Sequence, residues 1–342
     1  MARHGKNPML LTRRLAQPAP VTVITVVFLP ELEGFWRDGL EVLRRCLGSL
    51  RSTTPQPFEL VVMDNGSCAG VRTYLGELFE NRDIDQLLLS RRNLGKVGAW
   101  NLLFAAAQGE IVSYVDSDIY FLPGWFEATQ QVLDAYPEAG VVTAQAMSRD
   151  LRHYCGSTLR GAAADPSVEC DEGPGLVPRE YVEAHLTGLG ESRESYEQRI
   201  PTRHDVRLCR GDRQAFAGSA HFQFSGRREA LVELFPLASS RAMGDVNVLD
   251  EAIDDAGLWR LSTTGYYVHH MGNRVPDLEV ELPWVQQELS TTARGPGRAD
   301  ADRSRKSLSR QFWDRLGLSE RYRVRQLLKR LNRWSHELLY PD

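Results

Sequence analysis

Apolar runs alternate along residues 21–147 with segments in which apolar side chains recur every three or four positions. Uninterrupted apolar runs are typical of strands buried on both faces, and the wider spacing is typical of helices. The first helical segment carries Leu40, Leu43, Leu47 and Leu50. The alternation predicts an α/β fold, with a mostly parallel central sheet and helices on both faces. The predicted strands are 21–28, 58–64, 84–89, 110–116 and 139–147, and the further predicted helices are 71–79, 93–107 and one starting at Pro123.

The pattern changes after Met147. Residues 148–215 are rich in Gly, Pro, Arg and acids and show little periodicity, so we expect a long insertion, a candidate cover for an active site. Regular spacing then returns, with a strand at 220–226, helices at 227–235 and 246–256, and a strand-like run at 258–270. The expected regions are a disordered basic tail (1–20), the first half of the α/β domain (21–147), the insertion (148–215), the second half of the domain (216–276), a linker (277–302) and a basic helical extension (303–342).

The C-terminal extension combines positive charge with an apolar stripe. Between Arg303 and Arg333 it has eleven Arg or Lys residues against two acids, Asp314 and Glu320. Apolar residues at helical spacing predict an amphipathic helix. Such a helix could bind anionic lipid headgroups or an acidic partner, or it could pack on the domain with a solvated basic face, and we favour the second interpretation. The stripe consists of Leu327, Leu331, Trp334 and Leu338.

The bulk composition is that of an ordinary soluble protein. The chain has 342 residues, a formal net charge of −4 and 42% hydrophobic residues. No window approaches the roughly 18 consecutive apolar residues of a membrane span, and residues 1–20 lack the apolar core of a signal peptide. The five cysteines are irregularly spaced without a C-x-x-C pair, which favours a reducing setting. We therefore expect a cytoplasmic protein, peripheral to the inner face of the membrane if its basic helix binds lipid.

Two carboxylates, Asp116 and Asp118, stand one residue apart at the end of the predicted strand 110–116. Residues i and i+2 of an extended chain share a face, so the two charges repel each other unless a cation lies between them. Hard oxygen ligands select Mg²⁺ or Mn²⁺, whereas the simpler interpretation is a polar turn. Asp64 ends another predicted strand, and ligands of parallel sheets bind at the carboxyl ends of strands.

Several motifs occur in a fixed order between residues 21 and 147. They are VTVITVVF, LEVLRRCLGSL, FELVVMDNGS, RRNLGKVGAWN, YVDSD and LPGWF. In order and spacing they resemble the family 2 glycosyltransferases of the GT-A fold, in the nucleotide-diphospho-sugar transferase superfamily. The resemblance implies a GT-A type, Rossmann-like sandwich in which residues 21–147 bind a nucleotide-sugar and residues 216–276 face the acceptor. Its most specific parts are MDNGS, the D-x-D pair, and the N-x-G-x-x-x-A-x-N pattern of Asn93, Gly95, Ala99 and Asn101.

The resemblance also implies a donor site. The end of the first strand, Phe28 to Pro30, is expected to line the base pocket, and Asp64 to bind the base or ribose. The turn that contains Lys96 is expected beside the diphosphate, and Asp116 on the ribose or the water shell of a Mn²⁺ or Mg²⁺ ion that Asp118 binds directly. The expected nucleotide-sugar-binding residues are Phe28, Pro30, Asp64, Asn93, Gly95, Lys96, Asn101 and Asp116, and the expected metal ligands are Asp118, His270 and Asp116.

The second half of the chain supplies the expected catalytic base. By the resemblance, Gly244 stands where family members carry Glu, and Asp245 stands at the Asp that deprotonates the acceptor. His270 fits the family's V-x-H-x-G pattern better than His269 does, and adjacent residues of a strand point to opposite faces. Other acids compete with Asp245 for the role of base, namely Asp250, Glu251, Asp254 and Asp255.

The expected function is a metal-dependent, inverting transfer of a sugar from a nucleoside-diphosphate sugar to an acceptor hydroxyl. The acceptor is a glycan, a lipid-linked glycan or a natural product, and we expect no nucleic-acid partner. Two alternatives stay open: a catalytically silent relative that binds a nucleotide-sugar or a partner, and a sugar nucleotidyltransferase. The nucleotidyltransferase usually needs a basic, glycine-rich loop after the first strand, whereas residues 29–33 are acidic here. No G-x-G-x-x-G follows that strand either, which disfavours a dehydrogenase.

Overall fold

The computed structural model describes residues 17–148, 154–191, 204–243 and 245–282, together with residues 194, 197, 284 and 285. Gly244, most of the basic tail and the whole of the basic extension at 303–342 lie outside the described residues. Within the described residues, no helix is long and apolar enough to cross a membrane.

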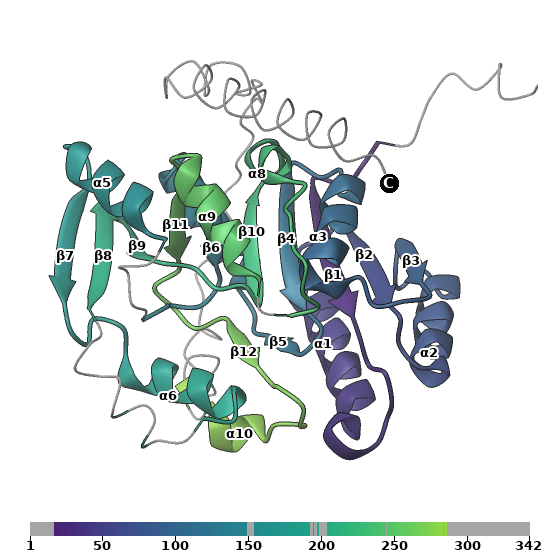
Figure 1. The fold of residues 1–342 in the computed structure, drawn as a ribbon. Helices are drawn as coiled ribbons and strands as arrows, with labels where there is room; N and C mark the ends of the chain where they lie inside the picture. The colour runs from purple at the N-terminus through teal and green to yellow at the C-terminus, as the bar shows by residue number, and fades with distance from the viewer. Residues whose placement is uncertain are drawn as a thin grey trace, which may run out of the picture.

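In this part of the chain, ten strands form one sheet and two more form a small second sheet (Figure 1). The small sheet consists of β5 (Ile119–Phe121) and β12 (Val268–His270). The strands of the large sheet, in spatial order, are β3 (Gln86–Ser90), β2 (Phe58–Asn65), β1 (Val21–Val27), β4 (Ile111–Asp116), β10 (Gln223–Arg227), β6 (Ala139–Thr143), β11 (Trp259–Ser262), β9 (Arg213–Ala217), β8 (Asp205–Arg210) and β7 (Glu169–Gly173).

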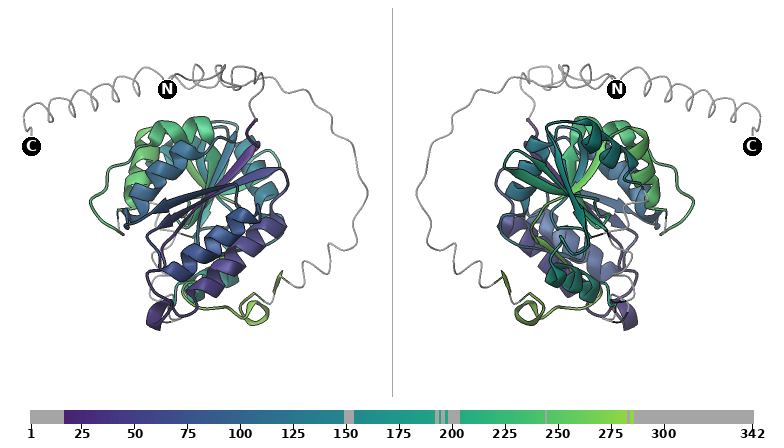
Figure 2. Two further views of the ribbon diagram at one scale, coloured as in Figure 1. Left: turned by 90° about the vertical axis from the view of Figure 1, so that its right-hand side faces the viewer. Right: turned by 90° about the vertical axis from the view of Figure 1, so that its left-hand side faces the viewer.

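The large sheet is mostly parallel, as the sequence predicts. Strands β3, β2, β1, β4, β6, β11 and β8 run one way, and β10, β9 and β7 run the other way. The reversed strand β10 lies between β4 and β6, so its start lies beside the end of β4. Figure 2 shows the sheet between two layers of helices, which confirms the predicted α/β fold class.

The helices cover the sheet because apolar residues of each strand point alternately to its two faces. Val23 of β1 packs on one face of the sheet, in a core cluster with residues of α1 and α2. Its neighbour Ile24 packs on the opposite face, in a second cluster with residues of α3, α8 and α9. The helices are α1 (Gly39–Thr53), α2 (Ala69–Glu80), α3 (Gly95–Ala106), α4 (Trp125–Ala135), α5 (Gly156–Ala164), α6 (Arg179–Gly188), α8 (Arg228–Leu234), α9 (Asn247–Asp255), α10 (Leu278–Glu281) and the 3₁₀ turn η2 (Gly34–Trp36).

The run at 258–270, predicted as a single strand, is two strands in different sheets. The prediction was wrong because β6, the parallel neighbour of β11, ends at Thr143, which pairs with Ser262. After that point the chain leaves the large sheet and continues as β12, which pairs antiparallel with β5. Strand β5 was not predicted, because its three residues are too few to show a period.

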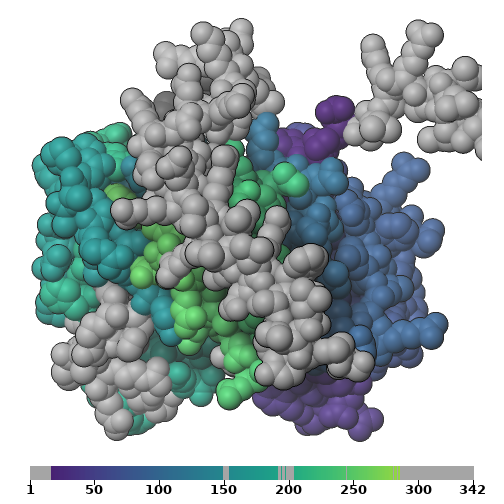
Figure 3. Space-filling view, turned by 45° about the horizontal axis from the view of Figure 1, so that its top comes forward, coloured from purple at the N-terminus to yellow at the C-terminus, as the bar shows by residue number. Residues whose placement is uncertain are grey.

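The region 148–215 contains more regular structure than its composition indicates. Its described parts form α5, α6 and the strands β7, β8 and β9, which extend the large sheet at one end (Figure 1). In the space-filling view the teal residues of this region lie at the left side of the molecule (Figure 3). Strand β7 forms the edge of that sheet and is largely exposed, so it shows no apolar run. Helix α6 packs against β12. The role of this region as an active-site cover stays a prediction, as do the region boundaries.

The contact between α6 and β12 depends on a glycine. A Cβ atom at Gly188 would lie 1.9 Å from the backbone oxygen of His270, far inside van der Waals contact. A Cβ at Gly76, in the middle of α2, would meet nothing within 4 Å.

We therefore predict that Gly188→Ala lowers the free energy of unfolding by about 1–3 kcal/mol, because α6 must move away from β12. Gly76→Ala is the matched control and should raise it by about 0.5–1 kcal/mol, since alanine restricts the unfolded chain. Chemical denaturation measures both values. An unfolding free energy of Gly188→Ala equal to or above that of the wild type would contradict the close packing described here.

Candidate active site

Acids stand at the carboxyl ends of two strands that flank β1. Asp64 lies near the end of β2 and is fully buried, and Asp116 is the last residue of β4. The Oδ1 atom of Asp64 accepts a hydrogen bond of 2.9 Å from the backbone N–H of Ser67. Its Oδ2 atom is buried without a hydrogen-bond partner among the described residues. A buried carboxylate oxygen of this kind indicates a missing ligand or water.

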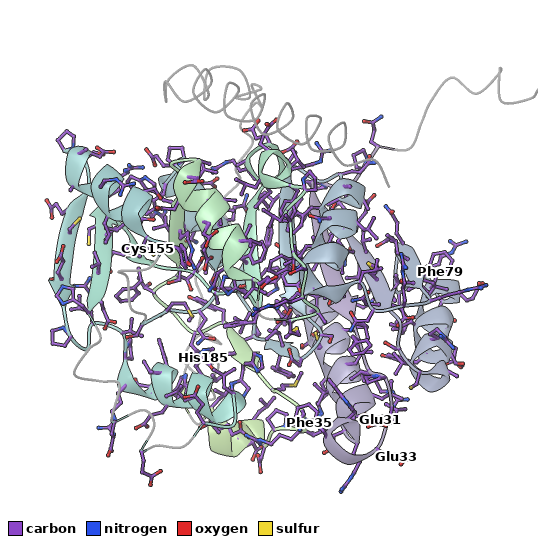
Figure 4. The ribbon with its side chains drawn as sticks, viewed as in Figure 1. Glu31, Glu33, Phe35, Phe79, Cys155 and His185 are labelled. Carbon is purple, nitrogen blue, oxygen red and sulfur yellow. The ribbon has the colours of Figure 1, made fainter. Side chains whose placement is uncertain are left out.

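The loop after β1 lies against the loop after β2. The backbone N–H of Leu29 donates to Ser67 Oγ, and the backbone N–H of Cys68 donates to the carbonyl of Leu29. This brings Phe28 and Pro30, the expected base-pocket residues, close to the chain that follows Asp64. Phe28 meets Trp36 edge to face, with ring centroids 6.3 Å apart. Figure 4 shows Glu31, Glu33 and the exposed ring of Phe35 farther along the same loop.

The Asn93–Lys96 turn is fixed by hydrogen bonds to the end of β2. Asn65 donates to Asn93 Oδ1 over 3.0 Å and accepts from the backbone N–H of Leu94 over 2.9 Å. Gly95 has a φ of +74°, and a Cβ there would lie 2.8 Å from the carbonyl oxygen of Arg241, so only glycine fits. The N-x-G pattern therefore has a structural cause, and the turn meets the 239–243 loop, where Lys96 N–H donates to the carbonyl of Ala242.

The Asn101 side chain forms two hydrogen bonds with the backbone of Leu237. Its side-chain NH₂ donates to the carbonyl of Leu237 and its Oδ1 accepts from the backbone N–H of Leu237, each over 2.8 Å. These bonds anchor the chain that follows α8 to α3. Asn101 therefore has a structural role. A contact between Asn101 and the nucleotide stays a prediction.

Both carboxylate oxygens of Asp116 are occupied. Oδ2 lies 2.6 Å from the ammonium nitrogen of Lys96, and Oδ1 accepts a hydrogen bond from the hydroxyl of Tyr114. Tyr114 was not singled out from the sequence, although it stands two residues before Asp116 on the same face of the strand. Burial and the neighbouring charge of Asp116 raise the pKa of Tyr114 well above its usual value, so its hydroxyl keeps the proton.

Asp118 faces His270 across the small sheet. The pairing of β5 with β12 sets Ile119 opposite His270 and places the Asp118 Oδ2 atom 3.7 Å from His270 Nε2. Burial raises the pKa of Asp118 and Asp116 raises it further, whereas His270 and Lys96 act in the opposite direction. The Oδ1 atom of Asp118 and the Nδ1 atom of His270 are both buried without hydrogen-bond partners in the described part of the chain.

These two side chains fit a divalent cation. A carboxylate oxygen and an imidazole nitrogen that lack partners are ligand types that Mn²⁺ accepts, and Mg²⁺ often keeps waters and substrate phosphates beside one or two carboxylates. Among the described residues, no group of three or more His, Cys, Asp or Glu side chains could hold a metal. The remaining ligands would therefore be water and substrate.

His269 points to the other side of β12. Its Nδ1 lies 2.8 Å from the hydroxyl of Tyr266, and its Nε2 lies 3.1 Å from Glu281 Oε2. Burial lowers the pKa of His269 to about 4, so the ring is neutral at neutral pH. Of the adjacent histidines, His270 is thus the one that faces Asp118. The insertion approaches the same strand, because His185 of α6 packs on Phe222, whose ring lies 5.7 Å from that of His270 (Figure 4).

Asp245 lies in a loop that touches the Asn93–Lys96 turn. Its carboxylate accepts hydrogen bonds from Ser239 Oγ and from the backbone N–H of Ser240, over 3.0 and 3.3 Å. Its side chain is 24% exposed, and its Oδ1 atom lies 3.8 Å from Nε of Arg241. The preceding residues of this loop contact Gly95 and Lys96.

Asp250, a rival of Asp245, has a structural role instead. Its side chain is 3% exposed and lies 2.9 Å from Arg260 and 2.8 Å from His221. Arg260 also donates to the hydroxyl and carbonyl of Ser219. The network holds residues 219–222 beside β4, where the carbonyl of Phe222 accepts from the backbone N–H of Asp116. No pattern in the sequence joins His221 to Arg260, so this network was missed.

Part of the chain that includes most of these motifs matches a family model. Residues 37–160 match the family model described as glycosyl transferase family 2. An uncharacterized glycosyltransferase of Nostoc sp. is 30% identical over 100 residues, which is 29% of this chain and 30% of that protein. The chain thus spans less than a third of the curated relative it matches.

Two solved structures match the chain at low sequence identity and with TM-scores below 0.5. GalNAc-T7, solved with UDP, GalNAc and Mn²⁺, is 14% identical, with a TM-score of 0.48 over 74% of this chain and 44% of that chain. TarS 1-349 of S. aureus, solved with UDP-GlcNAc, is 14% identical, with a TM-score of 0.44 over 79% of this chain and 66% of that chain. The match over residues 37–160 to the glycosyl transferase family 2 model confirms the resemblance that the motifs indicated.

Proposed function

We propose that this protein is a metal-dependent, inverting glycosyltransferase that moves a sugar from a nucleoside-diphosphate sugar to an acceptor hydroxyl. One observation carries the proposal. At the ends of β2 and β4, Asp64 Oδ2 and Asp118 Oδ1 are buried and have no hydrogen-bond partner in the described part of the chain. Such atoms are rare in folded proteins unless a ligand or water completes them. The family match supports a sugar nucleotide as that ligand.

The donor would span the strand ends. Asp64 Oδ2 would accept a hydrogen bond from the base or the ribose, with Phe28 and Pro30 beside the base. The diphosphate would lie toward Lys96 and toward the Asp118–His270 pair, which would hold Mn²⁺ or Mg²⁺. A cation bound there supplies positive charge to the departing diphosphate.

The acceptor side would be formed by the Asp245 loop. Asp245 would take the proton of the acceptor hydroxyl while the hydroxyl oxygen forms a bond to the anomeric carbon. The bond between that carbon and the diphosphate oxygen breaks on the opposite side, and the nucleoside diphosphate leaves with its electron pair. A single displacement of this kind inverts the anomeric centre and needs no covalent intermediate on the protein.

The first prediction concerns metal-dependent binding. Wild-type protein screened against UDP, GDP and dTDP should be stabilised by at least one of them in Mn²⁺, by about 2–3 kcal/mol at a hundredfold excess over the dissociation constant. Asp118→Ala should lose this stabilisation, while Asp134→Ala, an exposed acid on α4, should keep it. Thermal shift measures the effect. Stabilisation of Asp118→Ala equal to that of the wild type would refute the metal assignment.

The second prediction concerns the base. Asp245→Asn should bind the nucleoside diphosphate as the wild type does, but release it from a sugar donor about 10²–10⁴-fold more slowly. A coupled assay of nucleoside diphosphate release, in the presence of Mn²⁺, measures the rate. A rate within a factor of three of the wild type would place the base elsewhere. A loss of donor binding as large as the loss of rate would do the same.

The third prediction separates Asp245 from Asp250 by stability. Asp250→Asn should lower the free energy of unfolding by about 3 kcal/mol, because buried Arg260 loses its counter-charge. Asp245→Asn, in a partly exposed loop, should change it by less than about 1 kcal/mol. Urea denaturation of the two variants gives both values. The reverse order would make Asp245 the structural acid.

A further inference from the structure

Lys96 occupies an enclosed position at the start of α3. Its side chain is 11% exposed, and its ammonium nitrogen lies 2.6 Å from Asp116 Oδ2. The same nitrogen lies 5.5 Å from the ring centroid of Trp100 and 5.5 Å from that of Tyr114. A carboxylate and two aromatic faces thus surround the charge, and all three attract a cation.

The ammonium group keeps capacity for a ligand. It has three N–H donors, and Asp116 is the one acceptor that the described residues offer it through a hydrogen bond. Two of its donors therefore have no acceptor among the described residues. An ammonium with free donors beside the carboxyl end of a strand is suited to phosphate oxygens.

Tyr114 controls how Asp116 faces this lysine. Its hydroxyl occupies Oδ1, so the carboxylate meets Lys96 through Oδ2 alone. Its ring also forms one wall of the space around the ammonium and packs edge to face on Trp100, with centroids 5.2 Å apart. One buried side chain therefore fixes both members of the ion pair.

We propose that Tyr114 is a positioning residue that reserves Asp116 for Lys96, and that Lys96 is a fixed cation for the diphosphate of the donor. Asp116 is then not a metal ligand, in contrast to the expectation from the motif, and the metal is left to Asp118 and His270. This inference rests on the proposed function for its ligand, a nucleoside diphosphate. The contact between Lys96 and the diphosphate would contribute binding energy that does not depend on the metal.

The critical variant is Tyr114→Phe, which keeps the ring and removes the hydroxyl. The freed Asp116 carboxylate can then turn both oxygens to Lys96 or turn toward the cation position at Asp118. In the first case fewer ammonium donors are left for phosphate. In the second Lys96 loses the contact that holds its ammonium group in place, so we expect weaker phosphate binding in both. Tyr136→Phe is the matched control, because Tyr136 is also fully buried and donates to the carbonyl of Leu208 over 2.9 Å, away from these residues.

Nucleoside diphosphate binding is measured by calorimetry in EDTA and in Mn²⁺, with the tightest of UDP, GDP and dTDP as the probe. In EDTA the wild type should still bind, Lys96→Met should bind about tenfold more weakly or worse, and Tyr114→Phe about three- to tenfold more weakly. Tyr136→Phe should bind as the wild type does. Absence of binding by the wild type in EDTA alone, or equal effects of the two tyrosine variants, would overturn the proposal.

Mn²⁺ binding without nucleotide, measured by electron paramagnetic resonance, gives a second readout. Asp116→Asn should bind Mn²⁺ within about twofold of the wild type, and Asp118→Asn about tenfold more weakly or worse. Tyr114→Phe should bind the ion as tightly as the wild type or more tightly, whereas general damage to the site would weaken it. If no probe binds the wild type even in Mn²⁺, the proposed function fails. The Mn²⁺ measurement still tests the role of Asp116 in that case. Equal losses of Mn²⁺ affinity in Asp116→Asn and Asp118→Asn would overturn the claim that Asp116 is not a metal ligand.

Discussion

The repulsion between Asp116 and Asp118 is the constraint on which the rest of this site depends. Two carboxylates at the end of one strand are unfavourable in a half-buried place unless each finds a counter-charge. The protein separates them. Lys96 and Tyr114 satisfy Asp116 on the side of α3, and Asp118 turns to His270 in the small sheet. The two acids of the D-x-D motif therefore have different chemistry, although the sequence presents them as a pair.

This division depends on contacts between distant parts of the chain. His270 reaches Asp118 because β12 leaves the large sheet and pairs with β5, which directly follows the motif. On its other face β12 is held by the bonds of His269 to Tyr266 and Glu281. The insertion adds α6, which approaches the same strand through Gly188. The loop that carries Asp245 lies against the turn of Lys96, so the proposed donor and acceptor sides would share one wall.

Much of the fold could be predicted from the sequence because the strands of the first half are continuous apolar runs. The D-x-D pair and the N-x-G turn could also be found, because the residues of each stand within three positions of the sequence. Strand β5 was not predictable, because three residues show no period and its partner lies some 150 residues later. The Arg260–Asp250–His221 network was missed because its members are far apart in the sequence. Tyr114 stands close to Asp116 but was missed because it lies within an apolar strand run, which predicts only a core position. Burial and non-local pairing give these residues their roles, and a linear pattern contains neither.

The most direct test of the account is a crystal structure of the wild-type protein with Mn²⁺ and the nucleoside diphosphate that binds best. The position of the manganese is read from its anomalous scattering. The account predicts one ion bound by Asp118 and His270, with the diphosphate between this ion and Lys96 and the base near Asp64. An ion bound by Asp116, or a nucleotide bound away from the carboxyl ends of β1, β2 and β4, would contradict it.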